Sequence, residues 1–193
     1  MTFKTYDMFS SLVPGFLFLF GLLYILNIPY NKDYVIGYTA LSFFLGYLVN
    51  TLGSWFEQLY FFSWGGKPSS KLLEGKYIWK IRVYNYSQIR DHLSQKTIND
   101  TPTNDELFAI ALRNSNGQKD TRIEDFIAIY AFSRTLLTTV LIGGLFVVIK
   151  NYTDWKFYIA FITVVFILWL RCKQRAYYYA KEVLNVYCKI NSL

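Results

Sequence analysis

The sequence predicts an all-α membrane protein with four transmembrane helices, a small α or α+β insert between the second and third, and a helical tail. Its 193 residues are 53% hydrophobic and 20% aromatic, and the apolar residues occur in blocks, whereas a globular core needs them spread along the chain. A membrane-spanning helix needs about 20 mostly apolar residues, and the blocks approach or reach that length. The lysines and arginines, which give a formal net charge of +7, lie almost entirely outside the blocks.

The predicted spans are Ser11–Tyr30, Tyr34–Trp55, Phe126–Ile149 and Trp155–Leu170. The first span starts near a proline that fits the first turn of a helix, has no small-x-small cleavage site, and is followed closely by the second. We therefore interpret it as a retained span and not as a signal peptide. The expected divisions are a first transmembrane hairpin (1–64), an insert (65–125), a second hairpin (126–170) and a tail (171–193).

The distribution of positive charge predicts the orientation of the chain. Ten of the 20 lysines and arginines lie in the insert and five in the tail, whereas the two short loops of the other side hold Lys32, Lys150 and Lys156. Cytoplasmic segments carry the excess of lysine and arginine in membrane proteins. Both termini, the insert and the tail are therefore expected in the cytoplasm.

The third span carries one charge, Arg134, which costs about 2–3 kcal/mol on insertion scales unless it snorkels, pairs or faces water. Tyr130, Arg134 and Thr138 recur every four residues, so they form a polar stripe on one helix face. Two interpretations stay open: a pore-lining or gating role for Arg134, and a snorkelling or structural hydrogen-bond donor. We expect the Gly143-Gly144 pair in this span to allow close helix packing.

The second span has a polar stripe of its own. Its members are spaced 3, 4 and 3 residues apart: Tyr47, Asn50, Ser54 and Glu57. Polar groups in lipid associate with one another or with water, so this stripe either meets the third span within a subunit or lines a channel in an oligomer. Glu57 and Asp7 are the two candidate partners of Arg134, although an acid at the start of a helix, such as Asp7, is also favoured by the helix dipole.

The insert contains two capping-box patterns, Thr103 with Glu106 and Thr121 with Glu124. They predict a short helix that begins near Asn104 and a start of the third spanning helix near Arg122. The stretch YIWKIRVYNY favours a strand or hairpin arm, and a helix is also compatible with it.

In the tail, a heptad-like seam predicts a continuing helix that docks against the insert or a neighbouring subunit. The seam residues are Ala176, Tyr179, Val183, Val186 and Ile190. Six cations of the insert and tail are candidate phosphate contacts: Lys76, Lys80, Arg82, Arg171, Lys173 and Arg175. Beside the tail tyrosines such cations suit single-stranded nucleic acid, and membrane anchoring explains the same composition.

Motifs of catalysis and metal binding do not stand out in this sequence. His92 is the single histidine, and no nucleophile elbow, zinc-peptidase motif, phosphate-binding loop or dinucleotide fingerprint occurs. Cys172 and Cys188 are spaced too widely for a metal pair and are expected as free thiols. The sequence predicts no enzyme activity, no metal site and no cofactor.

The opening YDMFSSLVPGFLFLFGLLYIL, the second span ending LVNTLGSWFEQL, and the basic insert and tail resemble the small four-span membrane effectors of bacterial anti-phage defence, the Hailong type above all. Kiwa-type components and membrane accessory proteins of RNA-targeting CRISPR systems share this outline. The resemblance covers the whole chain as architecture. It implies a homo-oligomeric pore, expected as a tetramer, in the bacterial inner membrane, which a DNA oligomer from a partner nucleotidyltransferase holds shut.

From these observations we expect a membrane channel that is gated by a cytosolic nucleotide or oligonucleotide, such as single-stranded DNA or a cyclic nucleotide, and disrupts the membrane potential when open. The expected pore-lining or gating residues are Asn50, Ser54, Glu57, Arg134 and Thr138. The alternative is a non-conducting membrane scaffold that recruits a soluble defence partner, in which the two polar stripes close on each other within one subunit.

Overall fold

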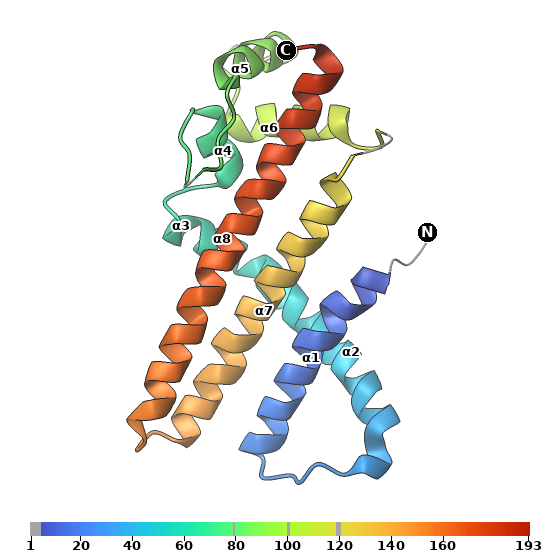
Figure 1. The fold of residues 1–193 in the computed structure, drawn as a ribbon, viewed down its shortest axis with the longest axis vertical. Coiled ribbons are helices and arrows are strands. Elements are labelled where there is room, and N and C mark those ends of the chain that lie inside the picture. Colours follow the sequence, from blue (N-terminus) through green and yellow to red (C-terminus); the bar gives the residue numbers. More distant parts are fainter. Residues whose placement is uncertain (1–4, 79, 100, 119–120) are drawn as a thin grey trace. The chain divides into compact units, whose positions relative to one another are not determined.

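The computed structural model describes residues 5–78, 80–99, 101–118 and 121–193, with the side chains from residue 10 onward (Figure 1). Within these residues the fold consists of eight α-helices and one short 3-10 helix, η1, which confirms the all-α prediction. The elements are α1 (Thr5–Ile25), η1 (Lys32–Tyr34), α2 (Val35–Trp55), α3 (Glu57–Ser63), α4 (Pro68–Leu73), α5 (Tyr86–Gln95), α6 (Asn104–Ser115), α7 (Ile123–Lys150) and α8 (Trp155–Asn191).

Three helical segments are long and apolar enough to cross a membrane: Lys32–Trp55, Ile123–Lys150 and Trp155–Asn191. They contain the second, third and fourth predicted spans and indicate a multi-pass membrane protein. The apolar part of α1 with described side chains, Ser10–Ile25, is shorter. A fourth span in α1 therefore stays a prediction.

The chain forms two compact units. The first, here called the membrane unit, comprises Met1–Gln58 and Ala128–Cys172. The second, here called the insert unit, comprises Leu59–Ile127 and Lys173–Leu193.

Helices α1 and α2 of the membrane unit cross with their backbones in contact (Figure 1). A Cβ atom on Gly15 would lie 1.8 Å from the carbonyl oxygen of Ser42, and one on Gly46 would lie 2.0 Å from the carbonyl oxygen of Ser11. Each helix therefore carries two small residues four positions apart, Ser11 and Gly15 in α1 and Ser42 and Gly46 in α2. This spacing lets membrane helices approach closely. The glycines of α7 allow aromatic rings to pack close to the helix, since a Cβ on Gly144 would lie 2.8 Å from the ring of Phe161.

Helix α1 ends at Ile25, five residues before the predicted end of the first span at Tyr30. Asn27 has a φ of 55°, in the left-handed region. The amide of Ile28 donates to the carbonyl of Leu23 at 3.0 Å, which completes a Schellman motif. Asparagine tolerates this conformation, so the helix stops although the following residues are apolar.

Lys150, the last residue of α7, binds the carboxyl end of α1. Its ammonium donates to the carbonyl of Tyr24 at 2.5 Å and to the side-chain oxygen of Asn27 at 2.6 Å, and lies 4.5 Å from the centre of the Tyr24 ring. A cation at this position adds a charged donor to the carbonyls at the end of a helix and complements the helix dipole. Lys150 thus joins α1 to α7.

Replacement of Lys150 by methionine is expected to lower the free energy of unfolding by about 1–2 kcal/mol, because charged hydrogen bonds to α1 are lost while the aliphatic chain is kept. Denaturant titration of the purified protein in detergent measures this change. Lys156→Met is the matched control, since the Lys156 side chain is exposed and makes no hydrogen bond or ion pair with the described residues. An equal loss in both variants would contradict the capping role.

The core of the insert unit is built around the end of α8. Its buried α8 residues lie on one face at helical spacing: Tyr177, Ala180, Val183, Leu184 and Tyr187. They pack with residues of α4, α5 and α6, including Leu73, Ile89 and Leu107. Docking of the tail on the insert is thereby confirmed. The buried face differs from the predicted seam, because Tyr177 is fully buried and Ile190 is 43% exposed.

The local predictions in the insert are confirmed in part. Thr103 and Glu106 form the predicted capping box at the start of α6. The stretch between α4 and α5 contains a single antiparallel bridge, Ile78 with Ile81, and no longer strand within the described residues. Ile81 and Val83 are buried in the core, which fixes this connection on the unit. Trp79 lies outside the described residues.

Candidate functional site

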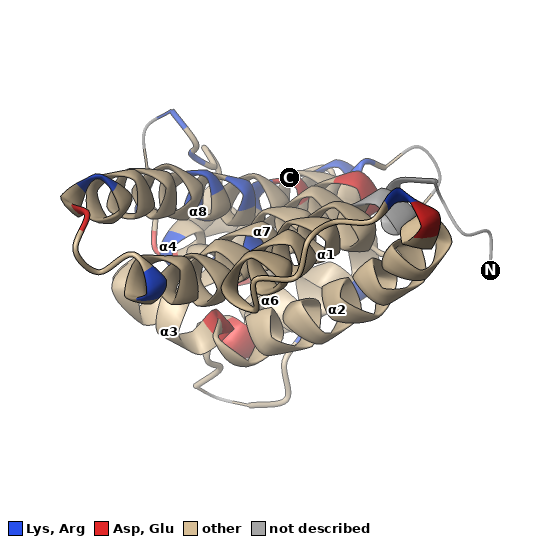
Figure 2. Ribbon diagram, turned by 90° about the horizontal axis from the view of Figure 1, so that it is seen from below, with Lys and Arg blue, Asp and Glu red and all other residues tan. Residues whose placement is uncertain are grey.

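The membrane unit carries few charges along its helices (Figure 2). Helix α2 contains no Asp, Glu, Lys or Arg, and in α7 Arg134 is the single charge between Asp125 and Lys150. A charged residue within a membrane-spanning helix indicates a candidate functional site, and its partner has to be identified.

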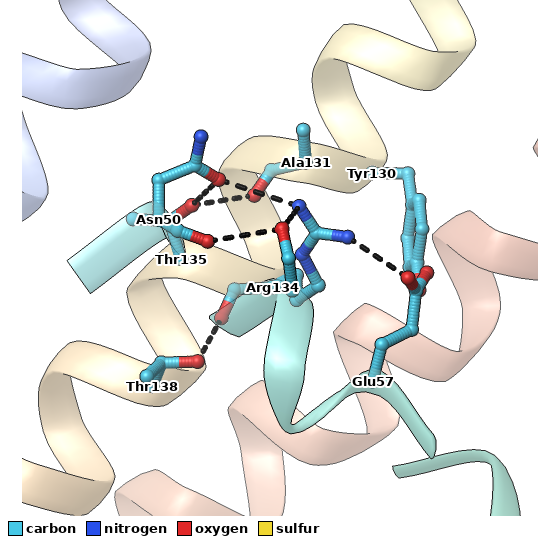
Figure 3. Close-up of polar contacts among 8 residues, drawn as sticks. Asn50, Glu57, Tyr130, Ala131, Arg134, Thr135 and Thr138 are labelled. Atoms are coloured by element: carbon cyan, nitrogen blue, oxygen red, sulfur yellow. Dashed lines mark hydrogen bonds and ion pairs between the residues drawn. The ribbon is translucent and has the colours of Figure 1, made fainter. Parts of the chain in front are cut away.

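The guanidinium of Arg134 is bound by side chains of α2 and α3 (Figure 3). One terminal nitrogen lies 3.2 Å from the carboxylate of Glu57. The other donates to the hydroxyl of Ser54 at 2.9 Å and to the side-chain oxygen of Asn50 at 3.3 Å. The Arg134 side chain is 12% exposed and that of Glu57 is 27% exposed, so the pair is shielded from solvent on most sides.

Glu57 is held from a second direction by Tyr130, one turn before Arg134 on α7. The phenol of Tyr130 donates to the other carboxylate oxygen of Glu57 at 2.5 Å. The Arg134 guanidinium carbon also lies 5.7 Å from the centre of the Tyr130 ring, which is within reach of a cation–π contact. Both carboxylate oxygens of Glu57 therefore have partners on α7.

Asn50 joins the same group through its side-chain oxygen, which accepts from the hydroxyl of Thr135 at 2.9 Å as well as from Arg134. We call this group the polar network; its members are Asn50, Ser54, Glu57, Tyr130, Arg134 and Thr135. Its donors and acceptors come from both polar stripes, and its formal charges cancel. The network therefore pairs two charges, each of which would raise the free energy of the protein if it lay unpaired in lipid.

Thr138, the fifth predicted pore residue, is fully buried. Its hydroxyl donates back to the carbonyl of Arg134 at 2.9 Å and faces Gly53 of α2, on which a Cβ would lie 2.9 Å away. The structure thus brings all five predicted residues together where α2 and the start of α3 meet α7. Whether they line a conduction path stays a prediction.

Of the two predicted partners of Arg134, Glu57 is confirmed. The side chain of Asp7 lies outside the described residues. Thr135 was missed by the sequence analysis, and Tyr130 was placed in the stripe without its bond to Glu57. The four-residue spacing finds the face of a helix, and it does not say which helix that face meets.

The six predicted phosphate contacts do not fall into one unit. Lys76, Lys80 and Arg82 are exposed on the connection between α4 and α5, where Arg82 stacks over the Tyr84 ring at 4.6 Å. Lys76 lies 2.8 Å from Glu74, and its hydrogen bond holds the pKa of that carboxyl below the ordinary value. The remaining three come from α8: Arg171 in the membrane unit, and the half-buried Lys173 and Arg175 in the insert unit.

Comparisons with protein-family models, curated proteins and solved structures give no match for this chain.

Among the residues that the structure describes, no group of three or more His, Cys, Asp or Glu side chains is placed to hold a metal ion. His92 instead shares a hydrogen bond of 2.9 Å with the hydroxyl of Tyr187, where it joins α5 to α8. Both cysteines are free thiols. The polar network is therefore the candidate site that the geometry supports best.

Proposed function

We propose that this chain is a subunit of a homo-oligomeric membrane channel, and that the polar network holds the channel closed. The observation that carries the proposal is the ion pair between Arg134 and Glu57 inside the membrane unit. An arginine in a span costs about 2–3 kcal/mol on insertion scales, and an apolar side chain would join the same helices without that cost. We therefore expect the Arg134–Glu57 ion pair to be a contact that breaks and re-forms, and not a permanent link between the helices.

The place of the network along the chain supports a switch. Glu57 is the first residue of α3 and lies two residues before Leu59, where the insert unit begins. Tyr130 lies two residues after Ala128, where the membrane unit resumes. A movement of the insert unit would therefore act on the chain next to residues that hold Arg134. Opening on this proposal separates Glu57 from Arg134 and exposes Asn50, Ser54 and Thr138 to the conduction path.

The proposed signal is an anionic nucleotide or oligonucleotide, either single-stranded DNA or a cyclic nucleotide from a partner nucleotidyltransferase. Exposed Lys76, Lys80 and Arg82 are suited to phosphate and the exposed Tyr84 ring to base stacking. We place both termini and the insert unit in the cytoplasm of a bacterium, the spans in its inner membrane, and expect a tetramer. The resemblance to anti-phage effectors supports a defence role in which opening disrupts the membrane potential, without enzyme activity or cofactor.

Ion flux from liposomes that contain the purified oligomer tests the proposal. Flux is measured alone, with short single-stranded DNA, and with cyclic nucleotides. We expect one ligand class to change the flux, in either direction. Absence of flux in every condition, from protein shown to be folded and oligomeric, would contradict a channel.

Conversion of Lys76, Lys80 and Arg82 to glutamine is expected to weaken binding of single-stranded DNA and to reduce the slope of log affinity against log salt by about 2, since each lost phosphate contact contributes roughly 0.7. Fluorescence anisotropy at several salt concentrations measures both. The control triple variant Arg113→Gln, Lys181→Gln and Lys189→Gln removes the same charge from other parts of the insert unit. Equal effects in the two variants would mean that net charge alone drives binding.

One observation favours the second candidate function, a non-conducting scaffold that recruits a soluble defence partner: the polar network closes within a single chain. Expression of the protein without other components separates the two candidates. A channel depolarises cells in at least one condition, and a scaffold in none.

A further inference from the structure

Helix α3 exposes two large apolar side chains within the insert unit. Phe62 is 86% exposed and Leu59 is 64% exposed. Of the other large exposed side chains of this unit, Ile98 lies on the connection between α5 and α6, and Tyr77 and Tyr84 carry hydroxyl groups that hydrogen-bond with water. Leu59 and Phe62 have no polar atom in their side chains, so water gives them no compensation.

The opposite face of α3 is packed. Tyr60 and Trp64 are buried, and their rings stack with centroids 6.4 Å apart. Because Leu59 and Phe62 are three residues apart, they share one face, while Tyr60 and Trp64 are four apart and share another. The helix is therefore oriented by its buried aromatic residues, and its second apolar face remains uncovered in a single chain.

The position of α3 along the chain indicates what covers this face. Helix α2 has 21 residues, which is about 31 Å at 1.5 Å per residue and matches the hydrocarbon thickness of about 30 Å. Phe62 follows the last residue of α2, Trp55, by seven positions, which is about 10 Å of helix. The headgroup regions add roughly 5–8 Å on each side of the hydrocarbon, so the chain keeps Leu59, four positions after Trp55, within headgroup depth and Phe62 near the outer edge of that layer at most.

The composition of α3 favours apolar insertion over attraction to charged lipid. No charged residue occurs from Gln58 to Gly66, and the acid that opens the helix, Glu57, is already paired with Arg134. The segment ends at Gly65, whose φ of 77° reverses the chain after the helix. The segment that carries Leu59 and Phe62 is thus uncharged and short, and it follows a span directly in the chain.

We propose that α3 is an interfacial helix, and that its Leu59 and Phe62 side chains insert into the boundary between lipid headgroups and hydrocarbon. The partner is the phospholipid bilayer itself, in contact with the insert unit at a place separate from the exposed cations of the α4–α5 connection. The proposal holds whether or not the protein conducts ions. It also gives Glu57 a fixed depth, because Glu57 is the first residue of the inserted helix.

Nitroxide labels on the full-length protein in neutral phosphatidylcholine bilayers test this proposal. Cys172→Ala and Cys188→Ser first remove the native thiols, and Phe62→Cys or Leu59→Cys then provides one labelling site. Collision with oxygen, which concentrates in lipid, is compared with collision with a water-soluble nickel chelate. Asn114→Cys, at an exposed position on α6, is the matched control.

We expect labels at positions 59 and 62 to collide with oxygen and to be protected from nickel, and the label at 114 to behave in the opposite way. The pattern should persist at high salt, because the contact is apolar. Nickel access at 59 and 62 equal to that at 114 would place α3 in water and overturn the proposal. Exclusion of both reagents would overturn it too, since protein and not lipid would then cover the helix.

Discussion

Glu57→Leu is expected to lower the free energy of unfolding of the membrane unit by about 2–4 kcal/mol. Removal of one partner of a buried ion pair costs about 3–5 kcal/mol, and the value is reduced here because the Glu57 side chain is 27% exposed. Tyr130 also loses the acceptor of its hydroxyl. Unfolding in detergent, followed by circular dichroism, measures the loss.

Arg134→Met combined with Glu57→Leu should recover most of the lost stability, because an apolar pair of similar volume avoids the cost of dehydrating two charges. Glu74→Gln removes an exposed acid from its lysine partner and should change little. A double variant as unstable as the sum of its single variants would show that the two residues do not act on each other.

Gly15→Ala and Gly46→Ala are each expected to lower stability by about 3 kcal/mol, since overpacking costs 1–3 kcal/mol or more. The added methyl group would lie 1.8 Å and 2.0 Å from the carbonyl oxygens of Ser42 and Ser11 respectively. Neither backbone can yield without separation of α1 from α2.

Gly21→Ala in α1 and Gly37→Ala in α2 are the controls for these two glycines. Apart from the backbone of the same helix and the adjacent residues, no atom lies within 4 Å of a Cβ at either position, and alanine favours helix by roughly 1 kcal/mol over glycine. These variants should therefore be neutral or slightly more stable in the same unfolding experiment. Equal behaviour of all four variants would refute the close crossing of α1 and α2.

Much of the fold follows from the pattern of residues along the chain. Long apolar blocks predict the helices α2, α7 and α8, and the spacing of Thr103 and Glu106 predicts the start of α6. The partner of Arg134 was among two candidates because few acids lie near the spans. These features depend on the local spacing of residues or on the small number of acidic residues near the spans, and both can be read from one sequence.

Other features depend on contacts between residues far apart in the chain. Lys150 binds carbonyls that lie more than 120 residues earlier, and nothing near Lys150 in sequence indicates them. The small residues Ser11 and Gly15 do show the spacing of close packing, yet the pattern does not identify α2 as their partner. The end of α2 at Trp55 coincides with the predicted end of the second span, but the separate helix α3 that follows was not predicted, because no proline or glycine from Trp55 to Trp64 marks a break.

The central claim, that the polar network keeps a channel closed, is tested most directly by the ion permeability of liposomes containing Glu57→Gln protein. We predict that permeability rises at least about tenfold over wild type, because each loss of about 1.4 kcal/mol shifts an equilibrium tenfold. Gly15→Ala, which destabilises the same unit without touching the network, should not raise it. Wild-type permeability in folded, oligomeric Glu57→Gln protein would contradict the account.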